Sequence, residues 1–571
     1  MVSPKIKGYI ILLVILIGLS LSSVIVALVG FDIGWNNAQK RLKFDVEVPR
    51  LIDEYKPLTN HTFIVLIDGL RYDVATQIVK EGEGILADIY NNGFWAENAS
   101  TILPSLSPAV RDSLMTATVP AIHGYTGYGV EDRELPLEID FNIFKIAKDH
   151  GYTTAVVTDP LVYGVFHQWI DVAVDSEWVD DEVTHKDLKD YVEKNQIPNL
   201  AFVCYVETDE AGHAYGVGEE YYEVAKNASI YIKEDYKLLT NKTNNDVLFI
   251  VFSDHGHIDK GGHGGSEPEV MHIVIGFYGK NVRSSRFSER IMVYQIGATV
   301  SFVMGIPLPK YTLLPPIFEA FNVSEQRIAG YAIHFAHLKI NQIRGISEAY
   351  GYLNEVKDDI NSLNSTLTEA YSAYDDGDYP KAFNKAKEVY EVAIPLFNSL
   401  LEKAISGIIL QRIAISVFII IVLSVFITVV GRKYGILYDF VLGTILYGIS
   451  FAIFIALLYA LGDRISMSFS LTILYFIEGI IASFIASLML LYLSNKNIIR
   501  RYNPLITVIT AVSSGFLLEV LILFTYGVLA GAPLLLNDAY FAVYIAIVAA
   551  MGPIGYYLSL ILNEFIFKGE G

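Results

Sequence analysis

The distribution of apolar residues constrains the fold of this chain most strongly. One apolar run covers about 9–29, and from 406 to the last residue the sequence is almost continuously apolar. About 20 consecutive apolar residues are enough to cross a bilayer. We therefore predict six membrane spans, at about 9–29, 407–430, 437–461, 467–493, 504–530 and 539–563. The first run could be a cleaved signal peptide, but its length and the lack of a clear cleavage site favour a retained signal anchor over 1–30.

Basic residues predict how these spans are oriented. Lys5 and Lys7 precede the first span, and alternate later connections carry Arg432, Lys433, Lys496, Arg500, Arg501 and Lys568. By the positive-inside rule, both termini are cytoplasmic and residues 31–405 lie outside. That outside part also holds every N-x-S/T sequon, at Asn60, Asn98, Asn227, Asn241, Asn322 and Asn364. The sequence thus predicts a multi-pass cell-membrane glycoprotein with a five-span domain over 406–571.

Composition excludes several classes of protein. The formal net charge is −20, whereas a nucleic-acid-binding protein needs a basic face, so we expect no nucleic-acid partner. The single cysteine, Cys204, excludes an intrachain disulfide framework and a cysteine-rich zinc module. Cys204 lies within a predicted buried strand, where we expect it to be inert.

The outside part divides into two regions. Between 60 and 310, continuous apolar runs at 62–67, 153–158, 200–206, 247–252 and 272–277 alternate with helix-like stretches. Runs of this kind are typical of strands that are buried on both faces, so 31–325 is predicted to be an α/β domain with a mainly parallel sheet. Helical periodicity at 346–367 and 382–404, separated by a turn at 375–380, predicts a helical hairpin over 326–405 that serves as a stalk.

Three of the predicted strands run into loops that carry an aspartate. Asp68 follows the first strand, Asp209 follows the strand at 200–206, and Asp254 follows the strand at 247–252. The carboxyl ends of parallel strands form the ligand site of open sheets, so these aspartates should converge. Three crowded carboxylates repel one another unless cations balance them. Imidazoles that could join them are those of His213, His255 and His263.

These six residues suit two divalent metal ions. Carboxylates with imidazoles favour zinc, with manganese as an alternative. A two-metal site can clamp the attacking and leaving oxygens of a phosphoryl transfer. A hydroxyl nucleophile should come from the loop-to-helix segment 100–117, where backbone N–H groups can also meet a phosphate.

The ordered motifs resemble those of the alkaline phosphatase superfamily. Asp68 after a strand, Asp209-x-x-Gly212-His213, the sequence SDHG at 253–256 and Gly262-His263-Gly264 are similar to the type I phosphodiesterase/nucleotide pyrophosphatase group. The layout, with an N-terminal anchor, an outside domain and a multispan C-terminus, looks like that of the GPI ethanolamine phosphate transferases. The motif resemblance covers about 60–310, and the later helices and spans match in layout only.

The resemblance implies roles for individual residues. One metal would be held by Asp209, His213 and His263, and the other by Asp68, Asp254 and His255. The family's nucleophile lies ten residues before the glycine of a Thr-Gly pair, which here is Thr116-Ala117, so that Ser107 is implied. The family's threonine is replaced by serine, and proline occupies 108 rather than 109, which leaves Thr101 as an alternative. We expect structural roles for His123, His257 and His272, although His257 or His272 could contact substrate.

These features lead to competing functional expectations. The leading one is a membrane-anchored enzyme that transfers a phosphate-ester group on a lipid or glycan through a covalent phospho-serine. The alternatives are an ectophosphodiesterase or nucleotide pyrophosphatase that hydrolyses diesters, and an inactive receptor or scaffold. The five C-terminal spans favour a membrane-lipid partner. Within those spans, Glu478 and Glu519 could face a cavity for a lipid headgroup or could hydrogen-bond between helices.

Overall fold

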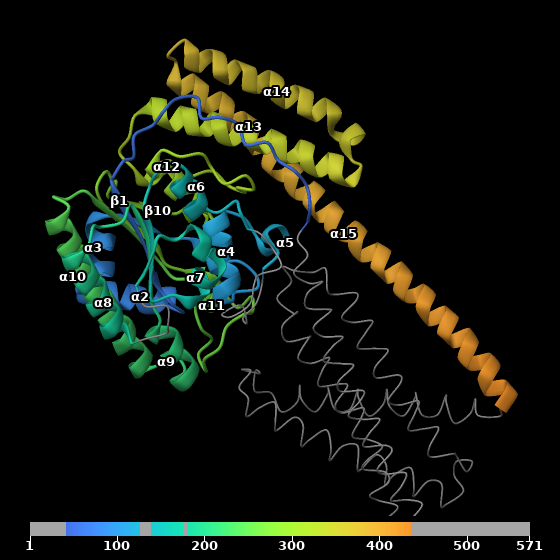
Figure 1. Cartoon of the computed structure of the whole chain (residues 1–571), viewed down its shortest axis with the longest axis horizontal. Helices are drawn as coiled ribbons and strands as arrows, with labels where there is room; N and C mark the ends of the chain where they lie inside the picture. Colours follow the sequence, from blue (N-terminus) through green and yellow to red (C-terminus); the bar gives the residue numbers. More distant parts are fainter. Residues whose placement is uncertain (1–41, 126–138, 175–179, 435–571) are drawn as a thin grey trace, which may run out of the picture. The chain divides into compact units, whose positions relative to one another are not determined.

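A computed structural model describes residues 42–125, 139–174 and 180–434 (Figure 1). Its main feature is an eight-stranded sheet with the order β10-β2-β9-β7-β1-β6-β4-β5, beside a three-stranded sheet with the order β11-β3-β8. The strands are β1 (His61–Ile67), β2 (Phe94–Ala96), β3 (Ala99–Ser100), β4 (Thr154–Val157), β5 (Val172–Val174), β6 (Leu200–Tyr205), β7 (Val247–Phe252), β8 (His272–Ile273), β9 (Ile275–Gly279), β10 (Ser285–Phe287) and β11 (Ile291–Met292).

Helices lie between most of the strands, and after β11 the described part of the chain contains helices but no further strand. They are α2 (Tyr72–Glu81), α3 (Gly84–Asn92), α4 (Ser107–Thr116), α5 (Pro120–His123), α6 (Ile143–Asp149), α7 (Pro160–Phe166), α8 (Asp181–Lys194), α9 (Glu207–Tyr215), α10 (Glu219–Lys242), α11 (Pro268–Met271), α12 (Gln295–Met304), α13 (Glu325–Tyr350), α14 (Leu353–Asp375) and α15 (Tyr379–Tyr434). Short 3₁₀ turns lie at His167–Trp169 and Phe318–Ala320.

The prediction of an α/β domain with a mainly parallel sheet is confirmed. Strands β7, β1, β6, β4 and β5 run parallel to one another, whereas β9 is antiparallel to both β7 and β2. The single strand predicted at 272–277 is wrong, because Val274 divides it into β8 and β9, which belong to different sheets. Val274 is held at this break by Ser253, whose hydroxyl oxygen accepts from the Val274 N–H and whose own N–H donates to the Val274 carbonyl, both at 3.0 Å.

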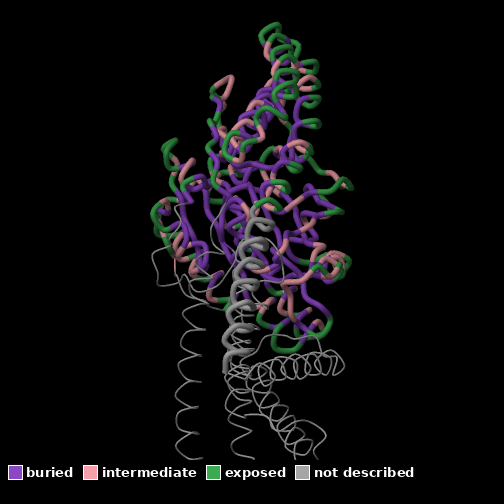
Figure 2. Tube along the Cα trace, turned by 90° about the vertical axis from the view of Figure 1, so that its right-hand side faces the viewer, coloured by how far each residue is buried: buried purple, intermediate pink, exposed green. Residues whose placement is uncertain are grey.

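Helices cover both faces of the large sheet. Figure 1 shows α3, α8 and α10 on one side of the strands and α4, α6 and α7 on the other. Alternate β1 residues, Phe63, Val65 and Ile67, pack with α2, α3, α8 and α10 in one hydrophobic cluster. The intervening residues Ile64 and Leu66 are also fully buried. Burial on both faces, which Figure 2 shows through the middle of the domain, explains why the strand sequences are continuously apolar.

Helix α13 packs directly onto the α/β region. The Tyr331 hydroxyl donates to the carbonyls of Ser301 and Ile306 at the end of α12, and Arg327 donates to the carbonyl of Lys56. The described residues from 42 to 406 accordingly form one compact unit. Sequence reasoning missed α13, and the helix predicted over 346–367 is interrupted at Gly351, whose φ of 79° ends α13 in a left-handed cap.

Most of the predicted membrane segments lie outside the described residues. These are the spans at 9–29, 437–461, 467–493, 504–530 and 539–563, together with Glu478 and Glu519. The span predicted at 407–430 falls within α15, whose side chains are not described beyond 407. Among the helices whose side chains are described, none combines the length and the apolar character that crossing a membrane requires.

Candidate active site

The three predicted aspartates meet at the carboxyl edge of the parallel sheet. Asp68 follows β1 directly, and its N–H donates to the carbonyl of Tyr205 at the end of β6. Asp254 lies two residues after β7, and its Oδ1 accepts from the N–H groups of Gly69 and His255 at 3.1 and 3.0 Å. Asp209 lies in the first turn of α9, directly after β6. The prediction that the three residues converge is therefore confirmed.

One cluster of potential metal ligands consists of Asp209, His213 and His263. Asp209 and His213 are four residues apart on α9 and share one face, with 3.4 Å between Oδ2 and Nε2. The Nε2 atoms of His213 and His263 are 3.1 Å apart. His263 donates its Nδ1–H to the carbonyl of Ser105 at 2.9 Å, so its Nε2 presents a lone pair to the cluster.

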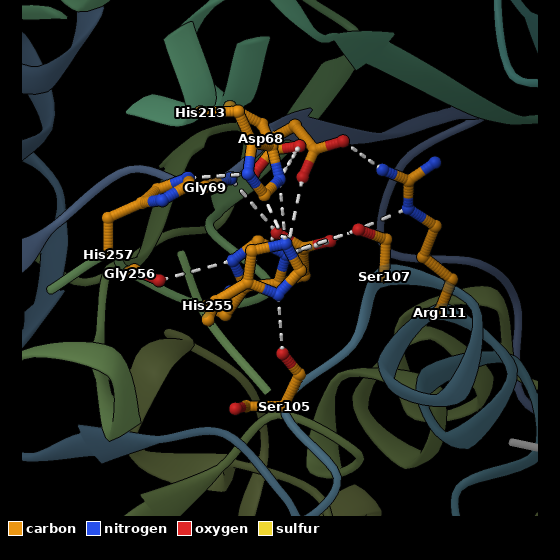
Figure 3. A network of polar contacts seen from close by, with 12 residues as sticks. Asp68, Gly69, Ser105, Ser107, Arg111, His213, His255, Gly256 and His257 are labelled. Carbon is orange, nitrogen blue, oxygen red and sulfur yellow. Dashed lines mark hydrogen bonds and ion pairs between the residues drawn. The ribbon is translucent and has the colours of Figure 1, made fainter. Parts of the chain in front are cut away.

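A second cluster consists of Asp68, Asp254 and His255, all fully or almost fully buried. His255 Nδ1–H donates to the Gly256 carbonyl, which leaves the Nε2 lone pair 3.7 Å from both Asp68 Oδ1 and Asp254 Oδ2. Ser107 Oγ lies 3.1 Å from the same nitrogen (Figure 3). The structure therefore brings all six predicted ligands and the predicted nucleophile into one site.

The donor atoms of this site fit divalent cations. Asp68 Oδ1 and Asp254 Oδ2 are buried and have no hydrogen-bond partner among the described residues, which is costly unless a cation satisfies them. Burial raises the pKa of Asp68 well above its usual value, even though Arg111 opposes this shift. Burial together with His255 lowers the pKa of His263 to about 3, which keeps its imidazole neutral, as a metal ligand must be.

Asp209 is held in its charged form. Burial alone would raise its pKa, but hydrogen bonds with His213 and His257 hold that pKa well below the usual value. Likewise, His255 and Arg111 overcome burial and lower the pKa of Asp254. Both carboxylates are therefore ready to bind a cation at neutral pH.

Arg111 places a permanent positive charge beneath the second cluster. It lies on α4, one turn after Ser107, and its side chain is fully buried. The guanidinium donates to Asp68 Oδ2 and, at 2.6 Å, to Asp159 Oδ2, while Nε lies 3.5 Å from Asp254 Oδ2. Sequence reasoning missed Arg111 and Asp159, although the spacing of four residues from Ser107 on a helix could have drawn attention to Arg111.

Two further contacts organise the site from loops. Ser105 joins the loop before Ser107 to the loop of His263, since its hydroxyl donates to the Gly265 carbonyl and accepts from the Gly264 N–H at 2.8 and 3.0 Å. His257 is buried beside Asp209, with 2.7 Å between Nε2 and Oδ1. The structural role expected for His257 thus involves a candidate metal ligand.

The remaining residues considered from the sequence lie in other surroundings. The N–H of Thr101 donates to the carbonyl of Met271, and its Oγ1 is buried without a hydrogen-bond partner in the described part of the chain. His123 pairs with the hydroxyl of Ser113 at 2.9 Å. His272 stacks on Tyr72 with 3.9 Å between ring centroids. Cys204 is buried in β6.

Comparison with known proteins gives an independent result. Residues 62–185 and 145–263 match the family described as type I phosphodiesterase/nucleotide pyrophosphatase. GPI ethanolamine phosphate transferase 2 of Kluyveromyces lactis is 21% identical over 327 residues, which cover 52% of this chain and 41% of that protein. The chain therefore aligns with about two fifths of the length of this curated relative.

Solved structures also show similarity. Murine ectonucleotide pyrophosphatase/phosphodiesterase 5 is 13% identical, with a TM-score of 0.38, and the match covers 45% of this chain and 96% of that one. A protein of the alkaline phosphatase superfamily from Vibrio parahaemolyticus is 14% identical, with a TM-score of 0.36, and the match covers 52% and 79% of the two chains.

Proposed function

We propose that the chain, whose residues 62–185 and 145–263 match the type I phosphodiesterase/nucleotide pyrophosphatase family, is a membrane-anchored two-metal enzyme. It would transfer a phosphate-ester group, such as phosphoethanolamine, on a lipid or glycan at the outer face of the membrane. The observation that carries this proposal is the convergence of six carboxylate and imidazole ligands beside the hydroxyl of Ser107.

The site's residues have distinct roles in this proposal. Asp209, His213 and His263 would hold one cation, and Asp68, Asp254 and His255 the other. When bound, two divalent cations, zinc or manganese, supply positive charge to the entering and leaving oxygens of a phosphoryl transfer. Ser107 is the first residue of α4, where backbone N–H groups that lack helical partners favour an anionic phosphate.

Ser107 would act as the nucleophile in two steps. Its hydroxyl loses a proton to solvent and Oγ bonds to phosphorus while the bond from phosphorus to the leaving alkoxide breaks, and that alkoxide takes up a proton. An acceptor hydroxyl or water then attacks the same phosphorus and gives up its proton, while the bond to Oγ breaks and Oγ takes up a proton, which restores Ser107. Transfer and hydrolysis differ only in the second attacking group.

A diester assay with the full chain in detergent tests the proposal. We expect Ser107→Ala to reduce turnover by at least about 10³-fold while bound metal persists, because the variant loses the nucleophile and keeps all six ligands. Thr101→Ala is the matched control and should keep its activity. Full activity in Ser107→Ala would refute the role of Ser107, and activity that is indifferent to chelation would refute the two-metal mechanism.

Hydrolysis of diesters is the second candidate function, and the family match to phosphodiesterases and nucleotide pyrophosphatases favours it. The similarity to a GPI ethanolamine phosphate transferase and the predicted membrane spans favour transfer to a lipid-linked acceptor. Incubation with a labelled phosphoethanolamine lipid, with and without a glycolipid acceptor, separates the two. Label on the acceptor supports transfer, whereas release of free phosphoethanolamine in both cases supports hydrolysis.

A further inference from the structure

The buried imidazole of His257 contacts Asp209, one of the candidate metal ligands. His257 follows β7 by five residues, and its side chain is fully buried. Its Nε2 lies 2.7 Å from Asp209 Oδ1, and the same oxygen lies 3.6 Å from His263 Nε2. Asp209 Oδ2 lies 3.4 Å from His213 Nε2. The oxygen Oδ1 is therefore within hydrogen-bond distance of His257 and also faces His263, whereas Oδ2 faces His213.

The position of the proton on His257 follows from its other contact. The backbone N–H of Gly262 donates to His257 Nδ1 at 2.9 Å. Since that nitrogen accepts, the neutral imidazole carries its proton on Nε2, and Nε2 donates to Asp209 Oδ1. His257 also lies close enough to Asp209 and His255 to form a group of potential metal ligands. A nitrogen that carries a proton is not available as a metal ligand, so in this tautomer His257 could act on a bound cation only through Asp209.

Close packing holds both members of this pair. A Cβ on Gly212 would lie 2.6 Å from His257 Nε2, so the ring rests against the glycine one position before His213. A Cβ on Gly69 would likewise lie 2.9 Å from Asp209 Oδ1. The imidazole and the carboxylate are therefore each in close contact with a glycine that has no room for a side chain.

We propose that His257 is a positioning residue that holds Oδ1 of Asp209, so that the carboxylate keeps a fixed orientation toward the cation bound with His213 and His263. This inference rests on the proposed function, because it concerns one of the two metal sites. The Gly262 N–H favours the His257 tautomer that is protonated on Nε2, and this Nε2–H orients the carboxylate of Asp209. Because the carboxylate is already oriented, it loses little rotational entropy when it binds a cation. Partners that orient metal ligands in this way commonly contribute 10–100-fold in metal affinity.

Zinc titration of the metal-free full chain in detergent, against a competing chromophoric chelator, tests this role. His257→Met removes the donor and keeps an apolar side chain of similar length, whereas His257→Gln places an amide N–H near the position of Nε2. We expect His257→Met to weaken one of two zinc ions by about 10–100-fold and to leave the other unchanged. We expect His257→Gln to restore the affinity to within about threefold of wild type, a rescue that a purely structural role would not produce.

Gly212→Ala gives an independent route to the same effect, because its Cβ displaces the ring of His257 without removing a ligand. It should weaken the same zinc ion as His257→Met. Wild-type affinity in His257→Met, or equal weakening in His257→Gln and His257→Met, would overturn the inference. If the wild-type chain itself binds no zinc, the proposed function fails, and this outcome is distinct from failure of the inference alone.

Discussion

Replacing Arg111 by methionine should destabilise the domain far more than removing a surface cation. The guanidinium of Arg111 is fully buried and donates to Asp159 at 2.6 Å and to Asp68. Both carboxyl groups are almost wholly excluded from water, so the substitution leaves them without their partner, and each must then keep an unpaired buried charge or take up a proton. Removal of one member of a buried ion pair costs about 3–5 kcal/mol, and we expect the free energy of unfolding to fall by that amount.

The size of the loss should depend on bound metal. Asp68 is a candidate metal ligand, whereas Asp159 caps α7 by accepting from the Val162 N–H at 2.8 Å. A cation beside Asp68 can offset part of the missing positive charge, but it has no comparable position beside Asp159. Arg111→Met should therefore be more destabilising in chelator-treated protein than in zinc-loaded protein.

Urea unfolding of the full chain in detergent, followed by the fluorescence of tryptophans such as the buried Trp95, measures this loss. Lys145→Met is the matched control, because Lys145 pairs with Asp149 at 2.6 Å while both side chains remain partly exposed. The control should cost about 0.3–0.5 kcal/mol. A loss in Arg111→Met no larger than in the control would refute the conclusion that Arg111 neutralises buried carboxylates.

Two further predictions concern the packing of Gly69 against Asp209 and the pair formed by His185 and Asp235. Gly69→Ala should weaken zinc binding by about tenfold or more, because the added Cβ meets Asp209. Gly151 also has a positive φ but open space around it, so Gly151→Ala should lower stability by only about 1–2 kcal/mol and leave zinc binding unchanged. Equal zinc affinity in the two variants would contradict this prediction. The hydrogen bond with buried Asp235 raises the pKa of His185. Protonated His185 therefore contributes its full stabilisation below about pH 6.5, the usual pKa of histidine, and this stabilisation is lost as the pH rises through the pKa of the folded state. The stability difference between wild type and His185→Gln should therefore be larger at about pH 6 than at about pH 9, and a difference that grew toward pH 9 would show that the sign is wrong.

The sequence predicted the candidate site better than it predicted the arrangement of the sheet. Asp68 and Asp254 each follow a strand whose apolar run is unmistakable, and parallel strands carry such residues to one edge. The antiparallel direction of β9 was missed because it depends on pairing with β7 and β2, which are distant in sequence. The break at Val274 depends in the same way on its bonds to Ser253.

The roles of Arg111, Asp159 and His257 could not be predicted from the sequence for a related reason. The contact between Arg111 and Asp159 joins α4 to the start of α7 across 48 residues, and no local pattern indicates it. The role of His257 requires both Asp209 and the Gly262 N–H in place. The end of α13 was different, because Gly351 is a helix stop signal that the sequence itself offers.

Counting the zinc ions bound per chain is the most direct test of the two-metal site. Elemental analysis of the full chain after zinc loading and removal of free metal should give about two ions in the wild type and about one in each of Asp209→Asn and Asp68→Asn, because each variant removes a ligand from a different cluster. Ser107→Ala should still bind about two, since it retains all six ligands. A wild-type chain without zinc, or unchanged stoichiometry in both aspartate variants, would contradict the account.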